Sequence, residues 1–232
     1  MATLGRYEIQ RTLSDDGMLA VHAARPASRP DAPLIRLVTF RPSAALIGHP
    51  RNTIERIAFV DAFKSQQQLA QSSESWARIT EIGRDGETTM VVVDHPPASL
   101  DDVVIGRVAL EANTLRHLVI EITRALRATV KADQRPHGAL APSSVLIQPG
   151  KPLDETSVRL TDPAPPLKDE SLDPHAEMRR LGLLILQLVD PQPTWMGVRW
   201  PIQSSPAWKR IGRSGEAWRE LVNRLLDPNA EQ

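Results

Sequence analysis

The chain has 232 residues, no cysteine, and 28 acidic and 28 basic side chains, so its formal net charge is zero. The absence of cysteine excludes disulfides, thiolate zinc sites and cysteine nucleophiles, and the balanced charge gives no reason to expect nucleic acid as a partner. No segment reaches the roughly 18 apolar residues of a membrane span, and the first residues lack a signal-peptide pattern. We therefore expect a soluble, cytoplasmic protein with no membrane contact from this segment.

The first part of the chain predicts strands and one helix. Residues 6–13 alternate apolar and polar side chains and end in a turn cluster at 14–17. Further strands are expected at 18–24, 34–40, 77–82 and 88–93, the last two joined by a hairpin turn at 83–86. Between them, residues 52–71 have helical spacing, and the residues expected to face inward are Ile54, Ile57, Ala58, Phe63 and Leu69.

The second part predicts mostly helices. The clearest is 110–131, whose apolar stripe consists of Leu115, Leu118, Val119, Ile122, Leu126 and Val130. Two short apolar runs follow at 144–148 and 157–161, and then an apolar helix at 178–189. A last helix is expected at 214–226, with Trp218, Leu221, Val222 and Leu225 on its inner face. Strands first and helices later predict an α+β protein that divides near residue 95.

Several segments occur in the order and spacing of a known family. Residues 137–147 read HGALAPSSVLI and residues 158–164 read VRLTDPA. They are similar to the catalytic loop H-R-D-L-K-P-x-N-I-L-I and to the strand ending in D-F-G of protein kinases. Residues 5–9 resemble the opening strand, 13–25 take the place of the glycine-rich loop, and 225–228 resemble the end of a late helix. Nearly the whole chain thus resembles a Ser/Thr protein kinase of the bacterial type.

The resemblance implies a bilobal protein-kinase-like fold. A small β-rich N-lobe would comprise residues 1–95, and a mainly helical C-lobe would comprise residues 96–232. The activation segment, from residue 162 to 178, would be shortened and rich in proline, with the single serine Ser171 and no A-P-E close. The chain stops at 227–232, before the last helix of the family, which leaves room for a further domain or a membrane anchor after Gln232.

Phosphoryl transfer by kinases depends on a glycine-rich loop, and on a strand lysine that pairs with a helix glutamate. The resemblance places the three loop glycines at Ser14, Asp16 and Leu19, and leaves only the neighbouring Gly17 as glycine. The lysine position is then Arg36. Two interpretations of Arg36 stay open: its guanidinium binds phosphate, or it points to solvent.

The helix glutamate is also replaced according to the resemblance. Its position falls on about Lys64, a cation that would repel Arg36, and Glu55 lies too far towards the N-terminus to substitute for it. The usual ion pair is therefore expected to be absent.

The catalytic loop has lost its chemistry under the same alignment. Ala139 replaces the catalytic aspartate, Ala141 the lysine and Ser144 the metal-binding asparagine. A methyl group cannot accept a proton, and no Asp or Glu lies between residues 134 and 151, so no shift of the alignment supplies a base. Asp162 keeps its family identity and either holds a metal or braces a turn. His137 matches a structural histidine.

The resemblance thus implies a pseudokinase with a degenerate nucleotide pocket at Asp16, Gly17, Arg36, Asp94 and Asp162. We expect nucleotide binding to be absent or weak, with no cofactor and no metal, Asp162 being the only retained metal candidate. The expected role is protein interaction, regulation or scaffolding with an unknown protein partner. One alternative is an atypical Ser/Thr protein kinase or another ATP-using transferase on the same fold, and another is a structural domain that holds neighbouring domains.

Overall fold

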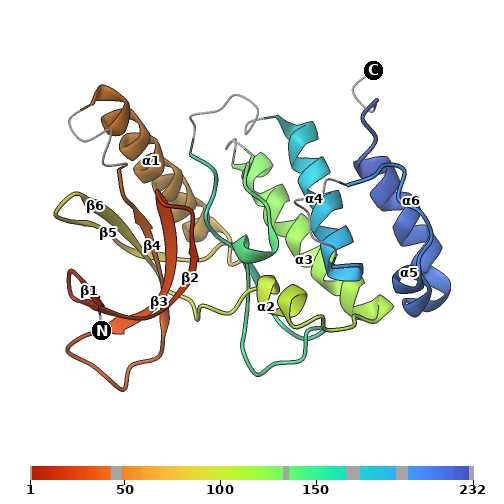
Figure 1. Cartoon of the computed structure of the whole chain (residues 1–232), viewed down its shortest axis with the longest axis horizontal. Coiled ribbons are helices and arrows are strands. Elements are labelled where there is room, and N and C mark those ends of the chain that lie inside the picture. The colour runs from red at the N-terminus through yellow and green to blue at the C-terminus, as the bar shows by residue number, and fades with distance from the viewer. Residues whose placement is uncertain (1, 43–48, 133–135, 166–172, 192–197, 230–232) are drawn as a thin grey trace.

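The computed structural model describes residues 2–42, 49–132, 136–165, 173–191 and 198–229. A sheet half (residues 2–93) and a helical half (residues 98–229) lie side by side along the long axis of the molecule (Figure 1). The predicted mixture of α and β structure is therefore confirmed. Among the described residues, no helix has the length and apolar character needed to cross a bilayer.

The sheet half contains one antiparallel sheet of six strands in the order β1-β2-β3-β4-β6-β5. The strands are β1 (Ala2–Leu4), β2 (Tyr7–Asp15), β3 (Leu19–Pro26), β4 (Ile35–Phe40), β5 (Ile79–Asp85) and β6 (Thr88–Val93). The sequence did not predict β1, because a strand of three residues is too short to show alternation. The β5–β6 turn is tighter than predicted, since Asp85 pairs with Thr88 across a two-residue turn that begins at Gly86, with φ of +55°.

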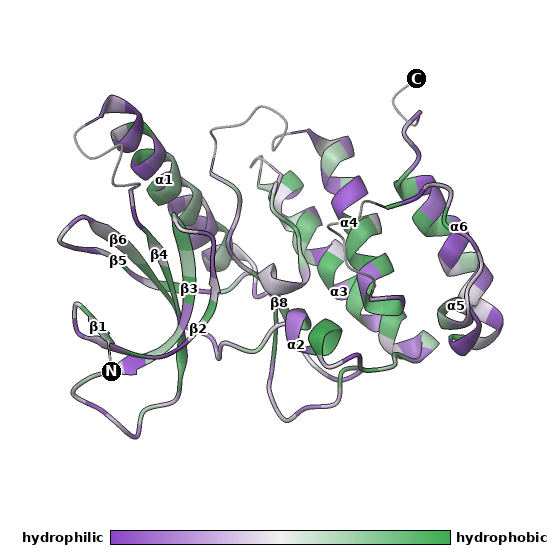
Figure 2. Ribbon diagram, viewed as in Figure 1, coloured by the Kyte–Doolittle hydropathy of each residue, from purple (hydrophilic) through white to green (hydrophobic). Residues whose placement is uncertain are grey.

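Helix α1 (Pro50–Ser72) covers one face of this sheet. Phe59 and Phe63 are buried against Val38 and Phe40, and the rings of Phe40 and Phe59 stack with centroids 5.6 Å apart. The central strands are the most hydrophobic part of this half (Figure 2).

The predicted orientation of α1 is wrong for Ile54 and Ile57, which are 57% and 53% exposed. A helix buries a stripe only about 100° wide, and the two phenylalanines occupy that stripe. At 100° per residue, both isoleucines fall on the opposite side of the helix.

In the part of the helical half that the structure describes, five α-helices pack around one core. They are α2 (Leu100–Ile105), α3 (Ala112–Lys131), α4 (Pro174–Val189), α5 (Pro206–Arg210) and α6 (Gly215–Leu225). The core contains Leu118, Ile122, Leu184, Ile185 and Trp208, each at most 1% exposed. The sequence did not predict α2 and α5, because six and five residues are too few for a helical period to be visible.

Two residues of the predicted inner faces are exposed. Val130 is 78% exposed in the last turn of α3, beyond the buried stripe that ends at Thr129. Leu221 is 39% exposed, because α6 packs on the core through its neighbour Val222.

A short hairpin connects the two halves. Its strands β7 (Val145–Ile147) and β8 (Val158–Leu160) pair with Val145 opposite Leu160. The Leu160 carbonyl accepts a hydrogen bond from the Ala77 N–H at 2.9 Å, and the Leu160 N–H donates to the Ser75 carbonyl at 2.9 Å. The hairpin therefore belongs to the helical half but is hydrogen-bonded to the segment that leads from α1 into β5.

Candidate functional site

The hairpin register brings two distant segments together. Because Val145 lies opposite Leu160, Ser144 lies opposite Thr161, and the Thr161 N–H donates to the Ser144 carbonyl at 3.0 Å. The loop 137–144 and Asp162 are therefore neighbours. Arg36, on β4, reaches the same place from the sheet half.

Arg36 joins the two halves of the molecule. Its side chain is 2% exposed, and its guanidinium donates to the Ser143 carbonyl at 3.1 Å and forms an ion pair with the Asp162 carboxylate. The interpretation in which Arg36 points to solvent is therefore wrong. Among the ion pairs formed by described residues, this is the pair that links the sheet half to the helical half. The Arg36 Nε has no partner among the described atoms.

Asp162 has protein partners for both carboxylate oxygens and for its N–H group. One carboxylate oxygen contacts Arg36, and the other accepts a hydrogen bond from the Thr161 hydroxyl at 3.0 Å. Its backbone has a φ of +57°, a left-handed conformation that aspartate tolerates better than most residues. The Asp162 N–H donates to the side-chain oxygen of Gln66 at 3.2 Å, which fixes this conformation.

Gln66 is the residue of α1 that contacts the site. It is fully buried, and its amide nitrogen donates to the Ala77 carbonyl at 2.8 Å and to the Thr161 hydroxyl at 3.2 Å. Gln66 stands beside the position near Lys64 that the resemblance assigns to the helix glutamate. Its contact with Asp162 was not predicted, because a glutamine inside a helix carries no signal that it will contact a residue 96 positions later.

Lys64 does not face Arg36, so the predicted repulsion between these two cations is wrong. Its side chain is 61% exposed, and its ammonium lies 3.9 Å from the Asp61 carboxylate. Lys64 sits on the outer side of α1, whereas Ala62 and Gln66 occupy the inner side. Glu55 pairs with Arg51 of the same helix at 2.8 Å.

The residues that the resemblance assigns to the catalytic loop form hydrogen bonds with one another. The Ala139 N–H donates to His137 Nδ1 at 3.2 Å. The Ser144 hydroxyl donates to the Ala141 carbonyl at 2.9 Å and accepts the Ala141 N–H at 3.0 Å, which closes the short 3₁₀ turn Pro142–Ser144. The Ser144 oxygen is therefore engaged in local structure, and Ala139 and Ala141 offer only methyl groups.

The surroundings of His137 are those of a residue with a structural role. It is 1% exposed, its Nε2 donates to the Thr161 carbonyl at 2.8 Å, and its ring lies 5.5 Å from the Trp76 ring. Burial lowers the pKa of His137 below its ordinary value of 6.5. The neutral imidazole thus donates from Nε2 and accepts at Nδ1, which suits the packing and hydrogen-bonding role predicted for it.

The carboxylates of the turn between β2 and β3 accept hydrogen bonds from N–H groups of the same turn. The Asp15 side chain accepts the Gly17 N–H at 2.8 Å, and the Asp16 side chain accepts the N–H groups of Met18 and Leu19 at 3.0 and 2.6 Å. Gly17 has a φ of +90°, which requires glycine. A phosphate-binding loop presents free backbone N–H groups to the anion, whereas in this turn three of them already have partners.

Asp94 is the remaining residue of the predicted pocket. Asp94 is exposed at the end of β6, and its N–H donates to the Arg78 carbonyl at 2.8 Å. Asp101, at the start of α2, was not predicted as part of the site. Burial raises the pKa of Asp101, the charge of Asp102 raises it further, and the charge of Arg36 lowers it. No group of three or more metal-ligating side chains occurs among the described residues.

The models of known protein families give no match to this chain, and no curated protein matches it in sequence. The geometry of the site therefore carries the functional argument below.

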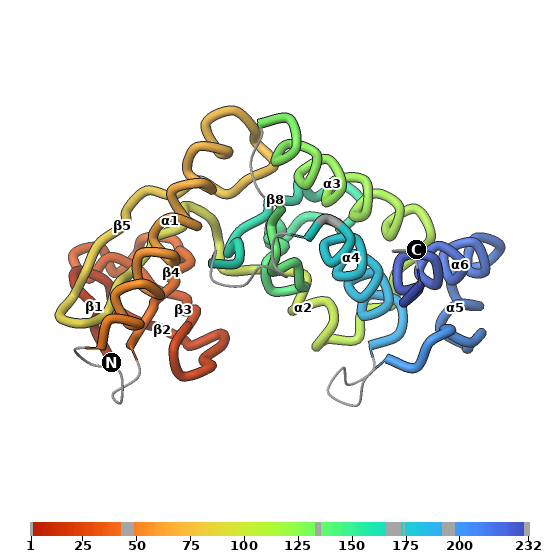
Figure 3. The backbone as a smooth tube through the Cα atoms, turned by 90° about the horizontal axis from the view of Figure 1, so that it is seen from above, coloured from red at the N-terminus to blue at the C-terminus, as the bar shows by residue number. Residues whose placement is uncertain are grey.

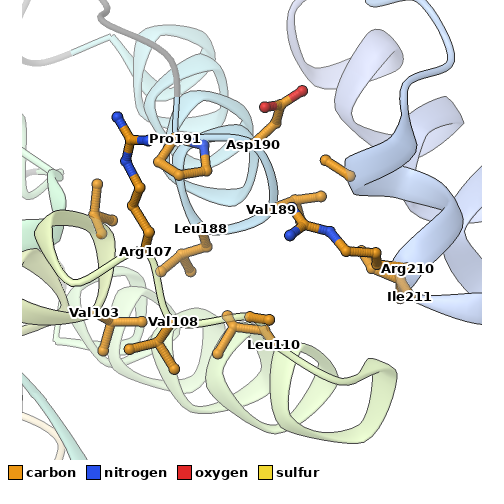
Figure 4. Close-up of a pocket in the computed structure, with 13 residues that line it drawn as sticks. Val103, Arg107, Val108, Leu110, Leu188, Val189, Asp190, Pro191, Arg210 and Ile211 are labelled. Atoms are coloured by element: carbon orange, nitrogen blue, oxygen red, sulfur yellow. The ribbon is translucent and has the colours of Figure 1, made fainter.

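A separate cavity of about 380 Å³ lies between the end of α4 and the loop that follows α2 (Figure 4). Its lining includes the apolar residues Val103, Leu110 and Leu188. Arg107, Arg210 and Asp190 also line it, and these three side chains sum to a single positive charge. Such a mixed lining selects no class of ligand, and we assign none.

Proposed function

We propose that this chain is a kinase-like domain without phosphotransfer activity, which acts as a protein-interaction, regulatory or scaffold module. The order of the elements supports this proposal: five strands with a helix between the third and fourth, followed by a mainly helical half, are what the resemblance implies for β2 to β6 and α1. The convergence of Arg36, the loop 137–144 and Asp162 on one place supports it further.

The observation that carries the proposal is the contact between Arg36 and Asp162. In the kinase resemblance, the γ-phosphate and its metal would lie between the strand cation, the catalytic loop and this aspartate. Here the guanidinium of Arg36 bridges the Ser143 carbonyl and the Asp162 carboxylate directly. A metal ion would have to displace Arg36 from Asp162, and Ala139 would still provide no base.

The first test is nucleotide binding to the wild-type chain. We expect melting curves with and without millimolar ATP and magnesium to superimpose, because the loop N–H groups and Asp162 are already engaged. If the dissociation constant exceeds the ATP concentration, stabilisation stays below roughly 0.4 kcal/mol. Differential scanning fluorimetry measures this, with Asp162→Ala as the control. A magnesium-dependent rise of several degrees that Asp162→Ala removes would instead support an atypical ATP-using transferase.

The second test is an attempted repair. We expect Ala139→Asp to remain without phosphotransfer activity, because the metal ligand at Ser144, the lysine at Ala141 and the glycine loop are still missing. Groups that act as a unit give non-additive effects, and each 1.36 kcal/mol of lost transition-state stabilisation is about tenfold in rate. The measurement is transfer of labelled phosphate from ATP to the chain and to generic protein substrates, by wild type and variant. Turnover by the single variant that Asp162→Ala abolishes would contradict this expectation.

A further inference from the structure

A shallow groove of about 1330 Å³ lies between the end of α1 and one side of α3. Figure 3 shows the last turns of these two helices near each other. The groove is lined on one side by Ser72, Ser73 and Ser75, and on the other by Val119, Ile120, Thr123, Arg124, Arg127, Ala128, Val130, Lys131 and Ala132.

The two walls of the groove are fixed relative to each other. The Trp76 side chain is 2% exposed, and its indole N–H donates to the Ala125 carbonyl of α3 at 3.1 Å. Leu69, near the end of α1, belongs to the same hydrophobic core as Leu118 and Ile122 of α3. The groove is therefore present before any ligand arrives.

The surface of the groove combines apolar and basic side chains. Ile120 and Val130 are 44% and 78% exposed. Arg124, Arg127 and Lys131 add three cations, and no acidic residue belongs to the described lining. Arg124 contacts Glu121 beside it, whereas Arg127 and Lys131 form no ion pair with any residue that the structure describes.

We propose that this groove binds an amphipathic helix of a partner protein, with acidic side chains along one edge of an apolar stripe. Arg124, Arg127 and Lys131 are spaced i, i+3 and i+7, so they form one line along α3. Acidic residues at the same spacing on a partner helix would pair with that line. Ile120, four residues before Arg124, begins the same line and Val130 lies beside it, so apolar residues next to the acidic ones would contact them, as in other complexes with a helix in a groove.

The lining argues against other ligands. Single-stranded nucleic acids stack on aromatic side chains, and no aromatic residue belongs to the described lining. A lipid surface is contacted by a broad face of large apolar side chains, whereas Ser72, Ser73 and Ser75 form one whole wall of this groove. Residues 119–132 extend over roughly 20 Å of helix, the length of three to four turns of a partner helix.

The inference names the partner class of the proposed interaction module and rests on that proposal. It is tested with a phage-displayed library of helical peptides of about 16 residues, or roughly 24 Å of helix, selected against the full chain. We expect enrichment of peptides in which Glu or Asp at i, i+3 or i+4 and i+7 flank Leu, Ile or Phe. Fluorescence anisotropy then measures the affinity of synthetic copies for wild type and variants.

The charge reversal Arg127→Glu combined with Lys131→Glu is expected to weaken these peptides about tenfold or more. Val130→Asp, at an exposed position, is expected to weaken them as well. The matched control Arg224→Glu, an exposed arginine of α6 outside the groove, should leave affinity unchanged. Circular dichroism of each variant checks that the fold is retained.

The inference is overturned if no acidic amphipathic peptide is enriched, or if the enriched peptides bind the doubly reversed variant as well as wild type. Equal loss with Arg224→Glu, or tighter binding to anionic vesicles or single-stranded RNA than to any peptide, would also overturn it. These outcomes are independent of ATP binding and phosphate transfer, so failure of the groove and failure of the non-catalytic proposal are distinguishable.

Discussion

Replacing Arg36 by methionine is expected to lower the free energy of unfolding by about 2 to 3 kcal/mol. The variant keeps most of the side-chain volume but leaves the Asp162 carboxylate and the Ser143 carbonyl without their cationic partner. Removing one member of a buried pair costs about 3 to 5 kcal/mol, and the expected value is lower because the Asp162 side chain is 21% exposed and retains some water. Urea unfolding followed by circular dichroism measures the change as a shift in midpoint.

Two further variants separate the ion pair from the loss of packing. Asp162→Asn removes the charge on the other side, and the double variant should be less destabilised than the sum of the single variants, since it leaves no unpaired charge. Arg124→Met is the matched control, because the pair of Arg124 with Glu121 lies at the surface and should contribute less than about 0.5 kcal/mol. If Arg36→Met were no less stable than Arg124→Met, the proposed importance of the contact between the halves would be wrong.

The second large effect is a loss of stability at low pH. His22, His95 and His137 are 3%, 5% and 1% exposed, and burial lowers the pKa of each below 6.5. Below pH 6.5 the unfolded chain binds protons that the folded chain excludes, so the free energy of unfolding falls as the pH is lowered. Each imidazole that stays neutral in the folded chain lowers the free energy of unfolding at pH 5.5 by at most about 1.4 kcal/mol, and the three together lower it by about 4 kcal/mol. Above pH 6.5 the stability from these neutral histidines is fully present.

Urea titrations at pH 8.0, 7.0, 6.0 and 5.5 measure this effect, in a range where carboxyl groups contribute little. His95→Gln removes one titrating group while keeping an N–H donor for the Pro96 carbonyl, and should reduce the pH dependence by about a third. His175→Gln, at an exposed position, should leave it unchanged. A stability that is flat between pH 8 and 5.5, or a slope reduced equally by both variants, would show that the buried histidines are not the cause.

The sequence predicted the long elements well because their periods are visible locally. Residues 90–93 are a continuous apolar run at the end of the buried strand β6, and the stripe Leu115, Leu118 and Ile122 is fully buried in α3. The inner face of α1 was not predictable in the same way, because apolar residues occur on all its sides and the sheet selects the two phenylalanines. The strand β1 and the helices α2 and α5 were missed, because three to six residues are too few to show their period.

For the site, the sequence predicted which residues belong to it but not how they contact one another. The resemblance assigned Arg36, Ala139, Ser144 and Asp162 to one site, and the hairpin register places the last three of these in neighbouring segments. The partner of Arg36 was missed, because Arg36 and Asp162 are 126 positions apart and no local pattern reports such a contact. Nor did the sequence predict that the carboxylates of Asp15 and Asp16 accept hydrogen bonds from their own turn.

The buried side-chain amide of Gln66 affects how a partner would bind to this protein, because it holds α1 in place. It is bonded to the backbone of two segments and to the Thr161 hydroxyl, so α1 cannot rotate or slide without breaking several hydrogen bonds in a dry environment. A helix held in this way presents one geometry in every copy of the molecule. Association with the surface beside α1 would then lose little conformational entropy on the side of this chain, because that loss has already been incurred during folding. Such a surface is suited to a partner that stays bound, more than to a partner whose binding depends on this chain switching between two conformations.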